Sequence, residues 1–175
     1  MNFRRATATD AQEIATLHSA SWRLTYNTVL SQRYLEEVVP SERKEVWTQR
    51  MTSPAQNQLV IVAEGSAGIA GFACVFAQAH AEWGSYLENL HVASSHQGQG
   101  LGRALLARVA QWCEGQVAGG GLYLSVNQAN RYAQDFYLRL GARNAAEGVW
   151  NAPDGSLVPT FRFAWDSTAP LAVGA

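Results

Sequence analysis

The sequence predicts a mixed α/β domain in which strands come in runs and single helices are inserted late in the chain. Apolar residues recur at helical spacing between residues 14 and 51, and short runs rich in branched and aromatic residues begin at residue 58. One helix follows each of the fourth and fifth predicted strands. The 175 residues fit one domain. We place this domain over residues 1–166 and expect a loose tail, STAPLAVGA, over residues 167–175.

The N-terminal third predicts one short strand followed by three helices. Residues 3–6 form the strand, and Thr9 or Asp10 together with Glu13 is a start signal for a helix that ends near Trp22. Helical spacing resumes between residues 30 and 51 but is interrupted by Pro40. We therefore expect two short helices in this region, the second capped by Ser41.

From residue 58 the pattern changes to strands. The runs 59–65 and 69–77 are joined by a Ser-Ala-Gly turn and predict a β-hairpin, which a strand at 85–92 extends. Next come a helix from 101 to about 115, a strand at 122–126 and a helix at 130–140 that ends at Gly141. Segments 143–150 and 157–165 flank the turn Ala-Pro-Asp-Gly-Ser and predict a closing hairpin.

Composition narrows the function classes. The formal net charge is −1, without the basic stripe that binds a phosphate backbone, and no apolar window is long enough to span a bilayer, so we expect neither nucleic acid nor membrane as a partner. Cys74 and Cys113 form no CxxC pattern, and the N-terminus lacks a signal-peptide core, which favours the cytoplasm. The four histidines (18, 80, 91 and 96) show no metal-ligand spacing, and no metal is expected.

Three glycines alternate in the segment His96-Gln-Gly-Gln-Gly-Leu-Gly102, directly before a predicted helix. A plain loop is one explanation. A dinucleotide fingerprint requires an acidic residue about 20 positions later, where this chain ends a strand with Asn127, and an NTPase loop requires a lysine where Arg103 stands. Glycines still allow backbone N–H groups and a helix N-terminus to face an anion. The segment therefore favours a pyrophosphate cradle to which Arg103 adds charge.

The pattern Gln97-x-x-Gly100-x-Gly102 follows the strand Leu87–Val92 and closely resembles the acetyl-coenzyme A loop of the GNAT superfamily of N-acetyltransferases. The later segment Asn130-x-x-Ala133-x-x-Phe136-Tyr137-x-x-x-Gly141 is similar to a second motif of that family, and the order of elements agrees over about residues 3–165. One departure is Ala142, where an aromatic residue often follows the glycine. The resemblance implies a mostly antiparallel sheet of six to seven strands flanked by about four helices.

The resemblance also implies a donor site for acetyl-coenzyme A. Backbone amides of the glycine loop would hold the pyrophosphate, and the strand backbone would hold the pantetheine arm and polarise the thioester carbonyl. Asn130 resembles a cofactor-contacting asparagine, although a helix N-cap explains it equally well. The expected cofactor-binding residues are Leu90, His91, Val92, Gln97, Gly98, Gln99, Gly100, Leu101, Gly102, Arg103, Asn130 and Tyr137.

Two residues are candidates for the chemistry. Tyr137 aligns with a tyrosine that protonates the leaving sulfur in many family members; as a helix aromatic it is otherwise a core residue. Glu88 is the candidate base, acting on the amine through water, and its alternative is a solvated or paired strand glutamate. Strand alternation predicts Tyr86 and Leu90 on the face of Glu88, with His91 on the opposite face.

The acceptor site is the least defined part. The segment His18 to Leu35 resembles a GNAT branch that acetylates small amines, which makes Trp22, Tyr26, Trp83 and Tyr86, with Glu36 and Glu37, candidates for its lining. We expect transfer of an acetyl group to a primary amine of a small molecule (a polyamine, an amino acid or similar) by direct attack in a ternary complex. The alternative is a non-catalytic acyl-coenzyme A-binding regulatory module, and an NTPase is a weaker third. A homodimer is implied by resemblance alone.

Overall fold

The computed structural model describes residues 1–173, in which seven strands form one sheet. The order across the sheet is β1-β2-β3-β4-β5-β7-β6, and every neighbouring pair is antiparallel except β4 and β5, which are parallel. The predicted mixed α/β fold with a mostly antiparallel sheet is confirmed. The strands are β1 (Asn2–Arg5), β2 (Gln58–Gly65), β3 (Gly68–His80), β4 (Gly84–Val92), β5 (Leu122–Asn127), β6 (Arg143–Asn151) and β7 (Leu157–Trp165).

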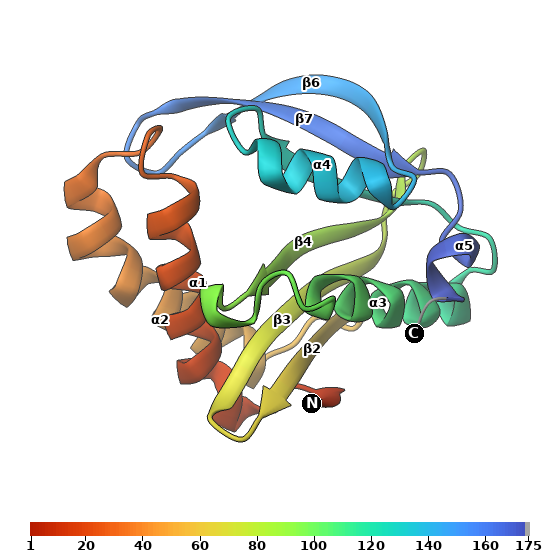
Figure 1. Cartoon of the computed structure of the whole chain (residues 1–175), viewed down its shortest axis with the longest axis horizontal. Coiled ribbons are helices and arrows are strands. Elements are labelled where there is room, and N and C mark those ends of the chain that lie inside the picture. Colours follow the sequence, from red (N-terminus) through yellow and green to blue (C-terminus); the bar gives the residue numbers. More distant parts are fainter. Residues whose placement is uncertain (174–175) are drawn as a thin grey trace.

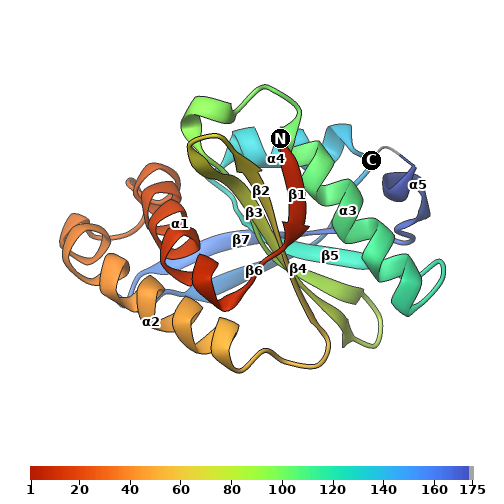
Figure 2. The ribbon, with the colours of Figure 1, turned by 90° about the horizontal axis from the view of Figure 1, so that it is seen from below.

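Helices cover both faces of this sheet (Figures 1 and 2). On one face α3 (Leu101–Gln116) and α4 (Arg131–Arg139) bury a core that includes Leu105, Val109 and Phe163. On the other face α1 (Ala11–Thr25) and α2 (Val39–Thr52) bury a second core, which includes Trp47 and Phe72. Burial of each large apolar side chain contributes roughly 1.5–3 kcal/mol, so the two cores hold the helices firmly against the sheet.

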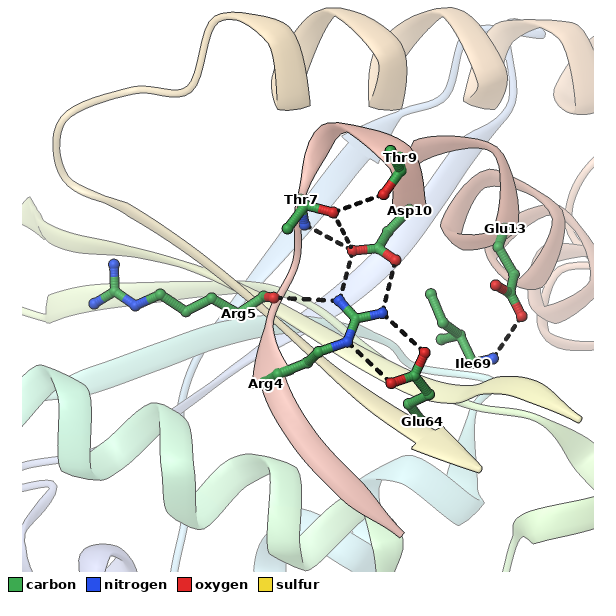
Figure 3. Close-up of polar contacts among 8 residues, drawn as sticks. All are labelled: Arg4, Arg5, Thr7, Thr9, Asp10, Glu13, Glu64 and Ile69. Atoms are coloured by element: carbon green, nitrogen blue, oxygen red, sulfur yellow. Dashed lines mark hydrogen bonds and ion pairs between the residues drawn. The ribbon is translucent and has the colours of Figure 1, made fainter. Parts of the chain in front are cut away.

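The start of α1 is fixed differently from the prediction. The Asp10 carboxylate accepts a hydrogen bond from the Thr7 N–H (2.7 Å) and pairs with Arg4, which also reaches Glu64 on β2 (Figure 3). The Arg4 guanidinium lowers the pKa of Asp10 to about 2. Glu13 does not cap the helix but accepts the Ile69 N–H at the start of β3. These contacts tie β1, α1 and the β2–β3 hairpin together, and α1 continues past Trp22 to Thr25.

The predicted break at Pro40 is wrong. Helical backbone is continuous from residue 32 to 52, because a π-helical turn (Tyr34–Val38) leads directly into α2. Pro40 lies in the first turn of α2, where its missing N–H costs little. Ser41 is not a cap, since its hydroxyl donates to the Val38 carbonyl (2.9 Å).

The expectation of a loose tail is also wrong for residues 168–172. Thr168 is fully buried and donates from its hydroxyl to Glu114 on α3, and the short helix α5 (Ala169–Ala172) follows. Leu171 packs against the core beneath α3. Residues 174–175 of the predicted tail lie outside the described residues. Among the helices that the structure describes, none is long and apolar enough to cross a membrane.

Candidate active site

A cleft of about 910 Å³ opens where two parallel strands separate. β4 and β5 pair only at Ser85 with Leu122 and at Tyr86 with Tyr123, so the rest of each strand has no partner on that side. The cleft lies between the free stretches and is lined by residues of α1, α2, α4, the glycine loop and the β6–β7 hairpin as well. Unpaired strand edges offer backbone N–H and C=O groups to an extended ligand.

A β-bulge at Glu88 decides which β4 side chains face which helices. Cys74 pairs with Asn89 and the next residue of β3, Val75, pairs with Leu87, which leaves Glu88 as the extra residue. Beyond the bulge, each β4 side chain therefore points to the face of the sheet opposite to the one expected for an unbroken strand. Leu90 packs into the core beneath α3, whereas His91 packs against Phe72 on the α1 side. The predicted placement of these two side chains is wrong, because it assumed an unbroken strand.

The glycine loop presents a run of free donors at one end of the cleft. Gly98 and Gly100 have φ angles of +74° and +80°, a backbone region that glycine adopts without strain. Within the described residues, the N–H groups from Gly98 to Arg103 donate to no backbone carbonyl. Gln97 and Gln99 brace the loop by donating from their side-chain amides to the Val92 and Ser95 carbonyls. The loop therefore exposes a run of N–H donors at the N-terminus of α3, the positive end of the helix dipole.

Tyr137 reaches the middle of the cleft from α4. Its ring packs edge-on against Phe136 and Trp165, at centroid distances of 5.1 and 6.0 Å, and only 9% of the residue is exposed. Burial raises the pKa of Tyr137, and the nearby Tyr26 raises it further. Its hydroxyl makes no hydrogen bond with the described residues, although Tyr137 lines the cleft. Tyr137 is thus a neutral hydrogen-bond donor with no partner of its own.

Two asparagines, Asn127 and Asn130, line the same cleft. Asn130 is the N-cap of α4, where its Oδ1 accepts the Ala133 N–H (3.1 Å), and it also lines the cleft. The Asn127 Oδ1 accepts the Ala129 N–H, while its buried Nδ2 has no partner within the described residues. The capping role of Asn130 and its place in the cleft are compatible, because the cap uses only the side-chain oxygen.

Glu88 is paired rather than free. Both of its carboxylate oxygens accept hydrogen bonds from Arg50 of α2, and Arg50 also donates to the Asn89 side chain (3.3 Å). The Arg50 guanidinium lies over the Trp47 ring, 4.9 Å from its centroid. Each carboxylate oxygen keeps a further lone pair for water or substrate.

Two histidines, His18 of α1 and His91 of β4, also line the cleft. The His18 and His91 rings are 4.6 Å apart. His91 Nδ1 lies 2.7 Å from the Ser21 hydroxyl, and burial lowers the pKa of His91 to about 4. His18 accepts the Trp47 indole N–H on Nδ1 and is kept neutral by burial, which lowers its pKa. Both rings are therefore uncharged near pH 7, and His91 has a lone pair with which to accept a proton.

Aromatic residues from distant segments close the other end of the cleft. Trp22 of α1 and Tyr26, directly after α1, both contact Trp150 of β6, with ring centroids 5.7 and 5.6 Å apart, and the Arg43 guanidinium lies 4.7 Å over the Trp22 ring. The tip of the β6–β7 hairpin is fixed there, because Asp154 accepts the Ser31 N–H (2.8 Å). Tyr86 also lines the cleft, stacked on Tyr123.

Most of the expected site residues converge on this cleft, and a few do not. Gln99 lies in the loop but does not line the cleft; its role is to brace the loop. Trp83, in the β3–β4 connection, packs under Arg143 and Arg162 outside the cleft, and Glu36 and Glu37 are exposed on the helix. The expected residues that do line it are Trp22, Tyr26, Tyr86, Glu88, Leu90, His91, Val92, Gln97, Gly98, Gly100, Leu101, Gly102, Arg103, Asn130 and Tyr137.

Sequence reasoning missed the residues that reach the cleft from α2 and β6. Arg43 and Arg50 are seven residues apart and read as solvated helix positions, and Trp150 reads as a strand aromatic. One sequence signal could have pointed to the two arginines. They lie two helical turns apart on a helix whose apolar face is weak. Within the described residues, no group of three or more His, Cys, Asp or Glu side chains could hold a metal ion.

Comparison with known proteins gives consistent results. The model of the acetyltransferase (GNAT) family matches residues 14–142. The uncharacterized N-acetyltransferase YuaI of Bacillus subtilis (strain 168) is 33% identical over 113 residues, and the match covers 62% of each chain. The PaiA N-acetyltransferase of Thermoplasma acidophilum, solved with coenzyme A, superposes with a TM-score of 0.69 over 91% of this chain and 96% of its own, at 18% identity. A mutant of the spermidine N-acetyltransferase SpeG of Vibrio cholerae superposes with a TM-score of 0.67. The match covers 98% of this chain and 97% of the SpeG chain, also at 18% identity.

Proposed function

The chain belongs to the GNAT family of acetyltransferases, and from this premise we propose that it transfers the acetyl group of acetyl-coenzyme A to the primary amine of a small molecule. The observation that carries the proposal is the cleft itself. An anion cradle, a free strand edge and an unpartnered tyrosine hydroxyl all line it. These three features suit the pyrophosphate, the pantetheine arm and the thioester sulfur of the donor.

The donor site is supported by the chemistry of the loop. The free N–H groups from Gly98 to Arg103 and the positive end of α3 suit a pyrophosphate, and Arg103 adds a formal charge. The edge of β4 from Leu90 to Val92 has no strand beside it and suits the amides of a pantetheine arm. Bound there, acetyl-coenzyme A supplies an acyl thioester whose carbonyl oxygen a β4 backbone amide polarises. A coenzyme A complex of the PaiA enzyme is among the similar structures.

The transfer itself is a direct attack without a covalent enzyme intermediate. The amine nitrogen forms a bond to the thioester carbon, the carbon–sulfur bond breaks, and the sulfur leaves as a thiolate that takes a proton. Tyr137 donates a hydrogen bond to that sulfur as charge develops on it. Because burial raises the pKa of Tyr137, the phenol keeps its proton and stabilises the thiolate through that hydrogen bond, and the thiolate takes its own proton from solvent.

The proton lost by the amine goes to Glu88 through a water molecule. The structure offers a second acceptor, His91, which is neutral, lines the same cleft and is oriented by Ser21. Glu88 is held by Arg50 on both oxygens, whereas His91 has a ring nitrogen with no hydrogen bond to the described residues. The pH dependence of kcat/KM in the Glu88→Gln and His91→Asn variants separates the two. A cytoplasmic location stays a prediction from the cysteine pattern and the N-terminal sequence, and a homodimeric assembly stays a prediction from the resemblance.

The test has two parts. Calorimetry with acetyl-coenzyme A examines the donor site, and no heat of binding at high micromolar ligand would remove the basis of the proposal. Release of free thiol with a panel of polyamines, amino acids and peptides then separates an enzyme from a regulatory module. A module binds the donor but releases no thiol above background with any amine, whereas the enzyme releases it with at least one.

A further inference from the structure

The acceptor end of the cleft, lined by His18, Trp22, Tyr26, Arg43, Arg50 and Trp150, is unbalanced in its hydrogen-bonding groups. Among the described residues, the buried side-chain N and O atoms without a partner are His18 Nε2, Arg43 Nε, Asn127 Nδ2 and Arg162 Nε. Each is a nitrogen of a residue that lines the cleft, and the first two belong to its acceptor end. With its Nδ1 accepting from Trp47, neutral His18 carries its proton on Nε2, so all four are N–H donors. A buried donor left unpaired costs about 1–3 kcal/mol, which favours a ligand rich in acceptor oxygens.

Arg43 places a positive charge on the wall of this end. Its side chain is only 14% exposed, and its guanidinium carbon lies 4.7 Å from the centroid of the Trp22 ring. One terminal nitrogen, Nη2, donates to Glu42, whose other oxygen accepts the Tyr34 hydroxyl (2.7 Å). Glu42 itself does not line the cleft. The guanidinium therefore faces the cleft with its carboxylate partner outside the lining, and Nη1 has no hydrogen bond within the described residues.

Free carboxylates are missing from the same wall. Of the described residues that line the cleft, Glu88 is the single carboxylate, and Arg50 occupies both of its oxygens. A polyamine carries further ammonium groups beyond the one that reacts, and these need carboxylates or other acceptors to replace water. Apart from the Arg50-paired Glu88, the described lining offers such groups no carboxylate. These observations favour an acceptor whose second charged group is negative.

We infer that the acceptor amine also carries a carboxylate, which Arg43 binds through its free Nη1, and an apolar or aromatic body that lies against Trp22, Tyr26 and Trp150. The substrate class is thus amino-acid-like rather than polyamine-like. Arginine suits this role because its guanidinium is always charged and Nη1 can donate a charge-assisted hydrogen bond to a carboxylate oxygen. The inference rests on the proposed function and narrows it to one class of amine.

The experiment compares matched amines with and without the carboxylate. Thiol release from acetyl-coenzyme A is measured with phenylalanine against phenethylamine, with leucine against isopentylamine, and with spermidine. We expect kcat/KM at least about tenfold higher for the carboxylate-bearing member of a pair, corresponding to one charge-assisted hydrogen bond. Arg43→Gln should lower kcat/KM for the amino acid at least about tenfold more than for its decarboxylated partner, and Arg43→Lys should restore part of the preference.

The matched control is Arg33→Gln, since Arg33 is 85% exposed, pairs with Glu37 and does not line the cleft. It removes the same charge from the same helical segment and should leave the preference as it is. Calorimetry with acetyl-coenzyme A on each variant checks folding, because Arg43 is not among the residues proposed to bind the donor. Faster turnover of spermidine or of the decarboxylated amines overturns the inference while the proposed function stands. Absence of thiol release with every amine overturns both.

Discussion

Replacing Tyr137 by phenylalanine removes one oxygen atom from the middle of the cleft and leaves the packing in place. The ring contacts with Phe136, Phe163 and Trp165 do not involve the hydroxyl, and that hydroxyl bonds to no other described residue. Stability should therefore change little. Binding of acetyl-coenzyme A should also be retained, because the hydroxyl is needed only once the sulfur carries charge.

The magnitude follows from the acidities involved. A phenol has a pKa near 10 and a thiol near 8.5, each pKa unit corresponds to about 1.4 kcal/mol, and burial raises the pKa of Tyr137 further. Complete transfer of the proton to the thiolate is then uphill by more than about 2 kcal/mol. Tyr137 acts mainly as a hydrogen-bond donor to a developing anion, a contribution of about 1.5–3 kcal/mol. We expect Tyr137→Phe to lower kcat about 10- to 150-fold.

The assay is thiol release at saturating acetyl-coenzyme A, with the dissociation constant of the donor measured separately by calorimetry. Tyr123→Phe is the control, because Tyr123 is a tyrosine of the same sheet region that does not line the cleft. An unchanged kcat for Tyr137→Phe refutes the hydrogen-bond role. A loss of affinity for acetyl-coenzyme A that accounts for the whole loss of activity refutes it as well.

Three further predictions concern the loop, the base and the N-terminal network. Gly100→Ala places a side chain at φ +80°, which costs about 1–2 kcal/mol. It should weaken acetyl-coenzyme A binding about tenfold. The control Gly119→Ala lies at φ +70° outside the cleft and should lower only the melting temperature. If Glu88 is the base, Glu88→Gln abolishes the acidic limb of the kcat/KM profile and His91→Asn keeps it; the reverse result assigns the proton to His91. Because the folded pKa of Asp10 is depressed from 3.8 to about 2, its stabilisation is present above pH 4 and is lost as the pH falls toward 2. Asp10→Asn should therefore lower the free energy of unfolding at pH 7 by about 2 kcal/mol and flatten its decline over that window, as urea titrations at each pH would measure, while no such flattening refutes the depressed pKa.

Local signals in the sequence predicted the order of elements well. The Gly68 turn, the run of glycines before α3 and Gly141 after α4 each fix a boundary through backbone conformations that glycine adopts easily. The failures share a cause as well. Pro40 reads as a break in isolation, yet the π-helical turn before it brings it into the first turn of α2. Thr168 reads as tail, yet its hydroxyl is buried against Glu114. Both outcomes depend on tertiary contacts that spacing along the chain does not carry.

The two ends of the cleft were predictable to different degrees for the same reason. The donor end is built largely from backbone groups of one continuous segment, Leu90 to Arg103, so its motif is visible in the sequence. The acceptor end joins side chains of α1, α2 and β6, and no local pattern connects Arg43 with Trp150. The β4 bulge adds a further obstacle, because one extra residue at Glu88 reverses the face of each residue after it.

That bulge also explains how one strand can serve donor and acceptor together. Upstream of Glu88, β4 pairs with β5 and its side chains Ser85 and Leu87 are buried in the sheet core. Downstream, the edge from Leu90 to Val92 is free for a pantetheine arm, and the reversed alternation places His91 toward α1, beside His18 and Ser21. A regular strand would send His91 toward α3 and Leu90 toward the acceptor end. The irregularity therefore brings the polar side chains of β4 and the free backbone edge to the same point, where the proposed function requires an amine to meet a thioester.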